Sequence, residues 1–154
     1  MQLASDILIE RTPQQVWAFL GDPANVAKWD RGVARVEETA MTQRGVGYEF
    51  ETVAHERFNL ADQGRMSYRI KEVDEENGRC VVELTSTTGN ARFFRQAEWR
   101  FDVCAEGGSS RLTCTAAFEL RWHWLILAPL LYLKRTAILL DLTLLKAAVE
   151  SQFS

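Results

Sequence analysis

The sequence contains few of the residues that build metal sites, disulfide scaffolds or nucleic-acid surfaces. Its three cysteines, Cys80, Cys104 and Cys114, have no C-x-x-C spacing, and only His55 and His123 could join them as soft metal ligands. We therefore predict reduced structural thiols and no metal site. The net charge is -3 and the basic residues are scattered. No nucleic-acid partner is expected, because binding a phosphate backbone needs clustered cations.

Familiar catalytic signatures, a membrane span and a secretory signal are missing as well. No G-x-S-x-G, H-E-x-x-H, Walker or dinucleotide motif occurs, so we expect no cofactor. The uncharged run from Trp122 to Leu133 is shorter than the about 20 residues that a span takes, although peripheral membrane contact stays open. The start has no basic residues before a long apolar stretch, so we expect no secretory signal and a cytoplasmic protein.

What is present is an ordinary globular composition, with 47% apolar and 25% charged residues. No internal repeat, low-complexity stretch or linker interrupts it. The chain is therefore predicted to form a single domain over residues 1–154.

The first thirty residues predict a strand followed by two short helices. A strand is expected over Leu3–Glu10, and Thr12-Pro-Gln-Gln15 then supplies an N-cap, a proline at the first helical position and a glutamine three residues after the cap. Gly21-Asp-Pro23 ends that helix, since proline cannot continue its hydrogen bonds. A second helical piece is expected over Ala24–Trp29.

From about residue 33 to 121 the apolar residues alternate with a period of two, which is typical of antiparallel strands. Recurrent turn residues leave room for about six strands, and Asn77-Gly78 is the strongest hairpin signal because both positions tolerate positive φ. In the last two strands one face is apolar. By this parity Arg95 points inward with Ala97 and Trp99.

The segment from Trp122 to Gln152 predicts a long helix, with Pro129 separating an entering turn from the main body or bending it. Leucines extend the apolar stripe around most of the helix, which implies burial on several sides. The leucines outside the stripe are Leu139, Leu140 and Leu144. A strongly curved sheet could cover such a helix, and so could a second subunit in a homodimer. We therefore predict an α+β fold in which a curved antiparallel sheet of about seven strands wraps the long helix.

This order of elements resembles the START and Bet v 1-like superfamily (SRPBCC), and within it the polyketide cyclase/dehydrase and lipid-transport group. The resemblance is carried by four short segments: Ile9–Trp17, Asp22–Asp30, Gly107–Thr113 and Leu142-x-x-Leu-Lys-x-x-Val-Glu150. It implies a helix-grip fold with a ligand pocket between the concave face of the sheet and the final helix, and with the short helices at the mouth. Members bind sterols, lipids, plant hormones or polyketides, and some are aromatase/cyclases.

The same resemblance conflicts with strand parity at one strand. The sequence is similar to the aromatase/cyclases at Ser67-Tyr-Arg69, where those enzymes carry pocket residues including an arginine, and this implies an inward Arg69. Parity instead places Tyr68 and Ile70 inside, and burying an unpaired guanidinium is costly. Arg69, Arg95 and Tyr68 are the candidates for catalysis, the arginines as cations and Tyr68 as a phenol that stabilises enolate charge.

The candidate ligand-binding residues combine strand parity with the pocket implied by the resemblance. They are Trp29, Tyr48, Phe50, Tyr68, Arg95, Trp99, Phe118 and Leu142. Asp22 and Asp30 are interpreted as caps of turns and helix ends, not as a carboxylate pair.

Three functions remain open at this point. The first is binding or transport of a small hydrophobic or amphipathic ligand, since the interior offers few convergent polar groups. The second is a polyketide cyclase/aromatase or dehydratase-like enzyme. The third is a membrane-peripheral or protein-interaction module that uses Trp122 to Leu133.

Overall fold

The computed structural model describes residues 1–38, 43–58, 64–133 and 135–154. The strands are β1 (Gln2–Ile9), β2 (Val33–Glu38), β3 (Glu49–Ala54), β4 (Met66–Asp74), β5 (Arg79–Leu84), β6 (Phe94–Glu106) and β7 (Ser109–Leu120). The α-helices are α1 (Pro13–Leu20), α2 (Val26–Trp29), α3 (Ala128–Leu133) and α4 (Arg135–Gln152). Short 3₁₀ helices are η1 (Pro23–Asn25), η2 (Glu56–Phe58), η4 (Gly89–Ala91) and η5 (Trp122–Leu127).

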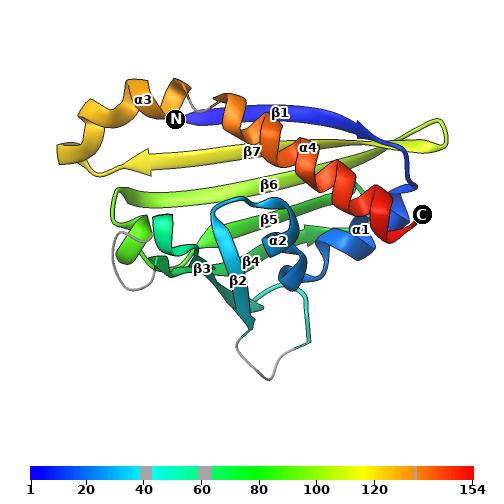
Figure 1. Cartoon of the computed structure of the whole chain (residues 1–154), viewed down its shortest axis with the longest axis horizontal. Helices are drawn as coiled ribbons and strands as arrows, with labels where there is room; N and C mark the ends of the chain where they lie inside the picture. Colours follow the sequence, from blue (N-terminus) through cyan, green and yellow to red (C-terminus); the bar gives the residue numbers. More distant parts are fainter. Residues whose placement is uncertain (39–42, 59–63, 134) are drawn as a thin grey trace.

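The described strands form one antiparallel sheet in the order β1-β7-β6-β5-β4-β3-β2. Strands β2 to β7 follow one another as a meander, and β1 closes the order beside β7. Helices α1, α2 and α4 lie on one face of this sheet, with α4 along β1, α1 against β6 and β7, and α2 beside α4 and β2, whereas α3 lies beyond the end of β7 (Figure 1). The α+β fold with about seven strands and two short helices after the first strand is confirmed.

Local signals in the sequence set the first helix. The Thr12 hydroxyl accepts from the Gln15 backbone N–H at 3.3 Å, and the Gln15 side chain accepts from the Thr12 N–H at 3.1 Å. This capping box satisfies two donors that the first turn would otherwise leave free. The buried Asn25 side chain then donates to the Phe19 carbonyl at 2.9 Å, which fixes the angle between α1 and the next short helices.

The C-terminal segment begins with an entering turn near Pro129, as expected. The 3₁₀ helix η5 ends at Leu127 and an α-helix starts at Ala128, with Pro129 in its first turn, where the missing N–H costs no hydrogen bond. No helix among the described residues is long and apolar enough to cross a membrane.

Helix α4 is less enclosed than predicted. Leu142, Leu145 and Val149 are buried, but Leu139, Leu140 and Leu144 are exposed. The sheet therefore covers one side of the helix, and the prediction that the outer leucines are buried within this chain is wrong.

The hydrophobic core fills only the part of the concave face that lies under α4. It joins side chains from β1, α1, β6, β7 and α4: Ile9, Val16, Phe19, Val103, Leu112, Cys114, Leu142, Leu145 and Val149. Trp29, Trp99 and Phe101 pack against the edge of this cluster while staying partly exposed. They form the boundary between the solid half of the interior and a hollow half.

Candidate functional site

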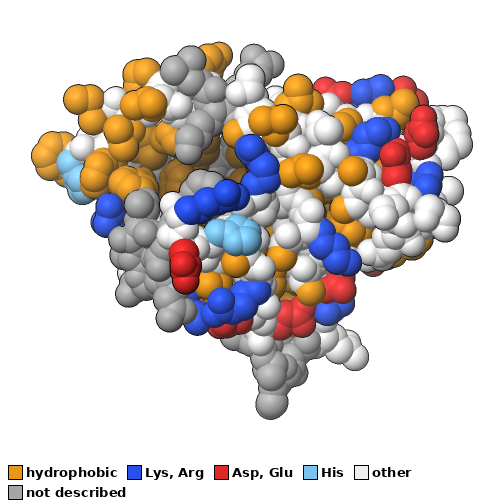
Figure 2. Space-filling model, viewed as in Figure 1, with side chains coloured by type: hydrophobic (Ala, Val, Ile, Leu, Met, Phe, Trp, Pro, Cys, Tyr) orange, Lys and Arg blue, Asp and Glu red, His pale blue; other side chains and the backbone are white. Residues whose placement is uncertain are grey.

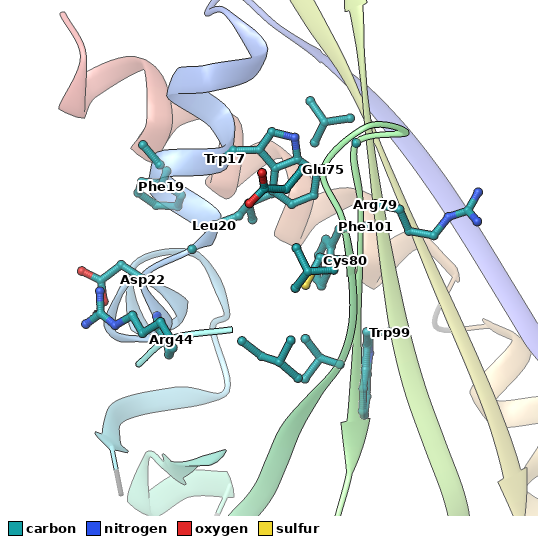
Figure 3. Close-up of a pocket in the computed structure, with 18 of the residues that line it drawn as sticks. Trp17, Phe19, Leu20, Asp22, Arg44, Glu75, Arg79, Cys80, Trp99 and Phe101 are labelled. Carbon is teal, nitrogen blue, oxygen red and sulfur yellow. The ribbon is translucent and has the colours of Figure 1, made fainter. Parts of the chain in front are cut away.

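A large cavity occupies the hollow half of the interior. Its volume is about 1320 Å³ and it is partly open to solvent. The walls come from α1, η1 and α2 on one side and from β3, β4, β5 and β6 on the other (Figure 3). None of its lining residues, as far as the chain is described, belongs to α4. The predicted position between the sheet and the C-terminal helix is therefore corrected, because the core fills the space beneath α4 and leaves the space beneath the short helices.

The cavity walls are dominated by aromatic rings. The lining includes Trp17, Trp29, Phe50, Tyr68, Trp99 and Phe101. Phe50 stacks on Tyr68 with ring centroids 5.4 Å apart, and Tyr68 meets Trp99 edge to face at 5.5 Å. Trp29 meets Phe101 in the same way at 6.3 Å. These contacts hold the rings in fixed orientations, so the cavity presents ready-made aromatic surfaces to a ligand.

Three polar side chains stand among these rings. Thr52 is buried and lies near the Tyr68 hydroxyl, which donates to the Met66 Sδ at 3.6 Å. Asp30 lines the cavity at the end of α2, where its Oδ1 accepts from the Gly32 N–H at 2.8 Å. We call Asp30, Thr52 and Tyr68 the polar cluster of the cavity.

Burial shifts the acidity of two members of this cluster. Desolvation raises the pKa of Asp30 above its usual range, against the smaller opposing effects of the Gly32 hydrogen bond and the Arg31 charge. Desolvation, and next the Asp30 charge, raise the pKa of Tyr68. Tyr68 therefore stays a neutral phenol at neutral pH, and Asp30 holds a proton more readily than a carboxyl in water.

Helix α4 reaches this region through one charged residue. Asp141 pairs with Arg31 at 3.3 Å, and burial followed by the Asp30 charge raises the pKa of Asp141. The C-terminal helix packs against α2 and brings this second carboxylate within electrostatic range of Asp30.

Charged residues also stand at the side of the cavity formed by η1 and the loop before β3. Asp22 and Arg44 lie next to one another there and pair at 3.1 Å (Figure 3). Asp22 also caps η1 by accepting from the Ala24 N–H at 3.1 Å. On the opposite wall Arg79 points away from the cavity, toward Asp102.

Of the eight candidate ligand-binding residues, the structure places four on the cavity wall: Trp29, Phe50, Tyr68 and Trp99. The parity conflict on β4 is resolved in favour of Tyr68 and Ile70, which line the cavity. Arg69 lies on the opposite face, where its guanidinium binds Glu83 at 2.6 Å. Arg69 therefore points away from the cavity and does not supply a cation to a ligand there.

The inward position expected for Arg95 is wrong. The pairing of β6 with β7 shifts register between Phe94 and Gln96, so the alternation inferred from Ala97 onward does not extend back across this irregularity. The Arg95 side chain is 77% exposed and lies 3.9 Å from Glu119.

Three further candidates lie away from the cavity. Tyr48 is buried, but its hydroxyl lies near the ion pair of Glu38 and Arg44. Phe118 packs edge to face on Phe94 at 5.7 Å, and Leu142 belongs to the core. None of the three is among the described residues that line the cavity.

Sequence reasoning missed Trp17, Thr52, Phe101 and the cavity-facing role of Asp30. Thr52 and Phe101 have the inward parity of their strands, and that signal alone could have included them. Asp30 carried no such signal. Its predicted capping role is present, as the Gly32 contact shows, but only the folded chain brings it near Tyr68.

The fold and the cavity together define a class: α+β proteins with a helix-grip architecture that enclose an apolar site between helices and a curved sheet. A family model described as "Polyketide cyclase / dehydrase and lipid transport" matches residues 2–142. The chain belongs to this family. No match was found among curated proteins.

Solved structures of the same architecture cover nearly all of the chain. An aromatase/cyclase from Streptomyces sp. R1128 has a TM-score of 0.77 at 11% identity, with 100% of this chain and 96% of that chain covered. A norcoclaurine synthase point mutant from Thalictrum flavum, in complex with a transition-state analogue, has a TM-score of 0.75 at 12% identity, with the same shares covered. A protein from Thermus thermophilus has a TM-score of 0.74 at 19% identity, and both chains are covered completely. At these identities the similarity establishes the fold.

Proposed function

We propose that the protein binds one hydrophobic or amphipathic small molecule, lipid-like or polyketide-like, in the cavity between the short helices and strands β3 to β6. The observation that carries this proposal is an aromatic-walled cavity of about 1320 Å³. Ligand pockets commonly measure about 300–1,000 Å³ and are lined mainly by apolar side chains with few polar groups. The cavity is larger than this range, so it has room for a large ligand.

The walls also indicate the shape of the ligand. Fixed aromatic faces favour flat or unsaturated groups, which stack on them or approach their edges. The polar cluster offers the carboxyl of Asp30 and the hydroxyl of Tyr68 as hydrogen-bonding groups among the aromatic rings of the cavity. The favoured ligand therefore has a large ring-bearing or unsaturated body and one polar group that reaches this cluster.

A fluorescence titration with N-phenyl-1-naphthylamine tests the proposal. Val82 lines the cavity, whereas Val46 is 68% exposed and does not line it. We expect Val82→Phe to change the affinity for the probe by about threefold or more, which corresponds to about 0.7 kcal/mol, because the added ring alters the wall against which the probe packs. The matched control Val46→Phe should bind as the wild type does.

Two results would contradict this account. One is a wild-type protein that neither binds the probe nor retains any molecule from a lipid extract in native mass spectrometry. The other is equal binding by Val82→Phe and the wild type.

A second function, cyclase or dehydratase-like catalysis, is favoured by one specific observation. Asp30, with a raised pKa, lies within electrostatic range of the neutral phenol of Tyr68, which stands on the facing wall of the cavity. A carboxyl poised toward neutral pH serves as a general acid or base, and a fixed phenol donates a hydrogen bond to a developing enolate oxygen. This pair would supply the chemistry that the outward arginines Arg69 and Arg95 cannot.

The second function is tested by the products formed from a poly-β-ketone thioester. We expect Asp30→Asn and Tyr68→Phe to change the product distribution while still binding the apolar probe. The controls Arg69→Gln and Arg95→Gln should leave it unchanged, since both side chains lie outside the cavity. If the wild type and all four variants give the uncatalysed product mixture, the protein is a binder only.

A further inference from the structure

The surface of η5 and α3 carries a concentration of exposed apolar side chains. Trp122 is 82% exposed and Ile126 is 83% exposed, and Leu125, Leu130 and Tyr132 are also exposed. We call these five residues the η5–α3 patch. Hydrophobic side chains gather over this end of the molecule in Figure 2. None of them lines the cavity, and a concentration of this kind marks an interaction surface.

The patch stands on a well-anchored segment. Trp124 turns away from it and meets Phe93 edge to face with ring centroids 4.7 Å apart. Arg121, directly before η5, donates to the Phe94 carbonyl at 3.3 Å and to the Thr87 hydroxyl at 2.8 Å. The fold therefore holds this segment against β6 and the loop before it while presenting Trp122 and Ile126 outward.

The charges beside the patch are predominantly basic. The Arg92 guanidinium lies 5.0 Å from the centre of the Phe93 ring, and this ring contacts Trp124. Arg95 is exposed at the start of β6. Glu119, 3.9 Å from Arg95, is the nearest acidic residue in the sequence before η5. From residue 120 to 140 the sequence contains no Asp or Glu, so every charge that it carries over that stretch is positive.

We propose that the η5–α3 patch docks the protein on the surface of an anionic lipid bilayer. Tryptophan and tyrosine favour the boundary between headgroups and acyl chains, and aliphatic side chains such as Ile126 enter just below it. Arg92, Arg95 and Arg121 then face the headgroups, where each cation adds attraction to anionic lipid. The mode is peripheral contact, since the described helices are too short or too polar to span.

Charge also favours an anionic lipid surface over a second copy of the chain as the partner of the η5–α3 patch. In a two-fold contact the same patch faces itself. That arrangement would bring Arg92, Arg95 and Arg121 of one copy toward those of the other. An anionic surface complements these charges.

Vesicle flotation tests the docking. The expected result is recovery with phosphatidylcholine vesicles containing about one-third phosphatidylglycerol, and much less with phosphatidylcholine alone. Recovery should fall when NaCl rises from about 0.1 M to about 0.5 M. We expect the double variant Trp122→Ser/Ile126→Ser to lose about tenfold or more of the binding, whereas Val46→Ser should keep it.

Brominated lipid gives a readout that needs no variant. Tryptophan fluorescence of the wild type should be quenched on vesicles of the anionic composition. Absence of flotation and quenching would overturn the proposal, as would equal recovery on neutral vesicles. A concentration-dependent dimer that the double variant abolishes, without vesicle binding, would assign the patch to a second copy instead. The cavity variant Val82→Phe should float normally, so failure of docking and failure of ligand binding are distinguishable.

Discussion

Replacing Gly78 by alanine should destabilise the fold, because the added Cβ would collide with the backbone of β6. Gly78 ends the β4–β5 turn with φ +62°, and its carbonyl accepts from the Val103 N–H at 2.8 Å. A Cβ at this position would collide with the Val103 carbonyl oxygen, close to the Trp17 indole. The turn lines the cavity, so its fit against β6 also shapes the site.

The magnitude follows from two contributions. A non-glycine residue in the left-handed region costs about 1–2 kcal/mol. Relieving the collision displaces the turn and weakens the hydrogen bond to Val103, which adds about 1–2 kcal/mol. We expect Gly78→Ala to lower the free energy of unfolding by about 2–4 kcal/mol, measured by urea denaturation. At about 2–4 °C per kcal/mol for a chain of this size, the melting temperature should fall by about 4–16 °C.

Gly107 provides the control for this prediction. It has nearly the same φ, +63°, in the β6–β7 turn, but an added Cβ there meets nothing within 4 Å. Gly107→Ala should therefore show only the backbone cost of about 1–2 kcal/mol. If Gly78→Ala costs no more than Gly107→Ala, the packing argument for the β4–β5 turn is refuted.

Three other outcomes are expected. Burial raises the pKa of Asp30, so this carboxyl binds its proton more tightly in the folded state than in the unfolded state. The free energy of unfolding should therefore fall as the pH rises from the unfolded pKa of about 3.9 through the raised folded pKa. Asp30→Asn, which keeps an acceptor for Gly32, should gain stability relative to the wild type between pH 4 and pH 7 in urea unfolding, and a constant difference would contradict this. Thr12→Ala should lower the free energy of unfolding by about 1 kcal/mol, because it removes the acceptor for the Gln15 N–H. Partial burial raises the pKa of the Cys80 thiol to about 11. Iodoacetamide at pH 8, followed by peptide mass spectrometry, should therefore label the exposed Cys104 first. Equal labelling rates would contradict this.

Much of the fold could be predicted because its signals are local. The Thr12 capping box lies within four residues, and it forms as expected. The meander follows from a period of two and from turn residues such as Gly78. Strand parity also placed Tyr68 and Ile70 correctly on the cavity side, because the irregularity in the pairing of β4 with β5 falls only after Ile70.

The errors arise where tertiary structure overrides these local patterns. An irregularity in the β6–β7 pairing interrupts the alternation before Ala97, and nothing in the sequence near Arg95 marks it. Likewise Leu139, Leu140 and Leu144 make α4 apolar all round although the sheet covers one side.

The site itself was only half predictable. The side chains that meet in the polar cluster come from α2, β3 and β4, and their approach depends on how α1 and α2 stand above the sheet. That position depends on long-range contacts, among them Arg31 with Asp141. A local capping role explained Asp30 in the sequence, and its exposure to the cavity became visible only in the fold.

The five tryptophans allow the central claim to be tested in one measurement. Trp17, Trp29 and Trp99 line the cavity, whereas Trp122 and Trp124 lie in η5. In a ¹H–¹⁵N spectrum each indole N–H gives its own signal, so a titration with N-phenyl-1-naphthylamine reports where the probe binds. If the cavity is the ligand site, the signals of Trp17, Trp29 and Trp99 shift and those of Trp122 and Trp124 stay in place. Shifts confined to Trp122 and Trp124 would contradict the account.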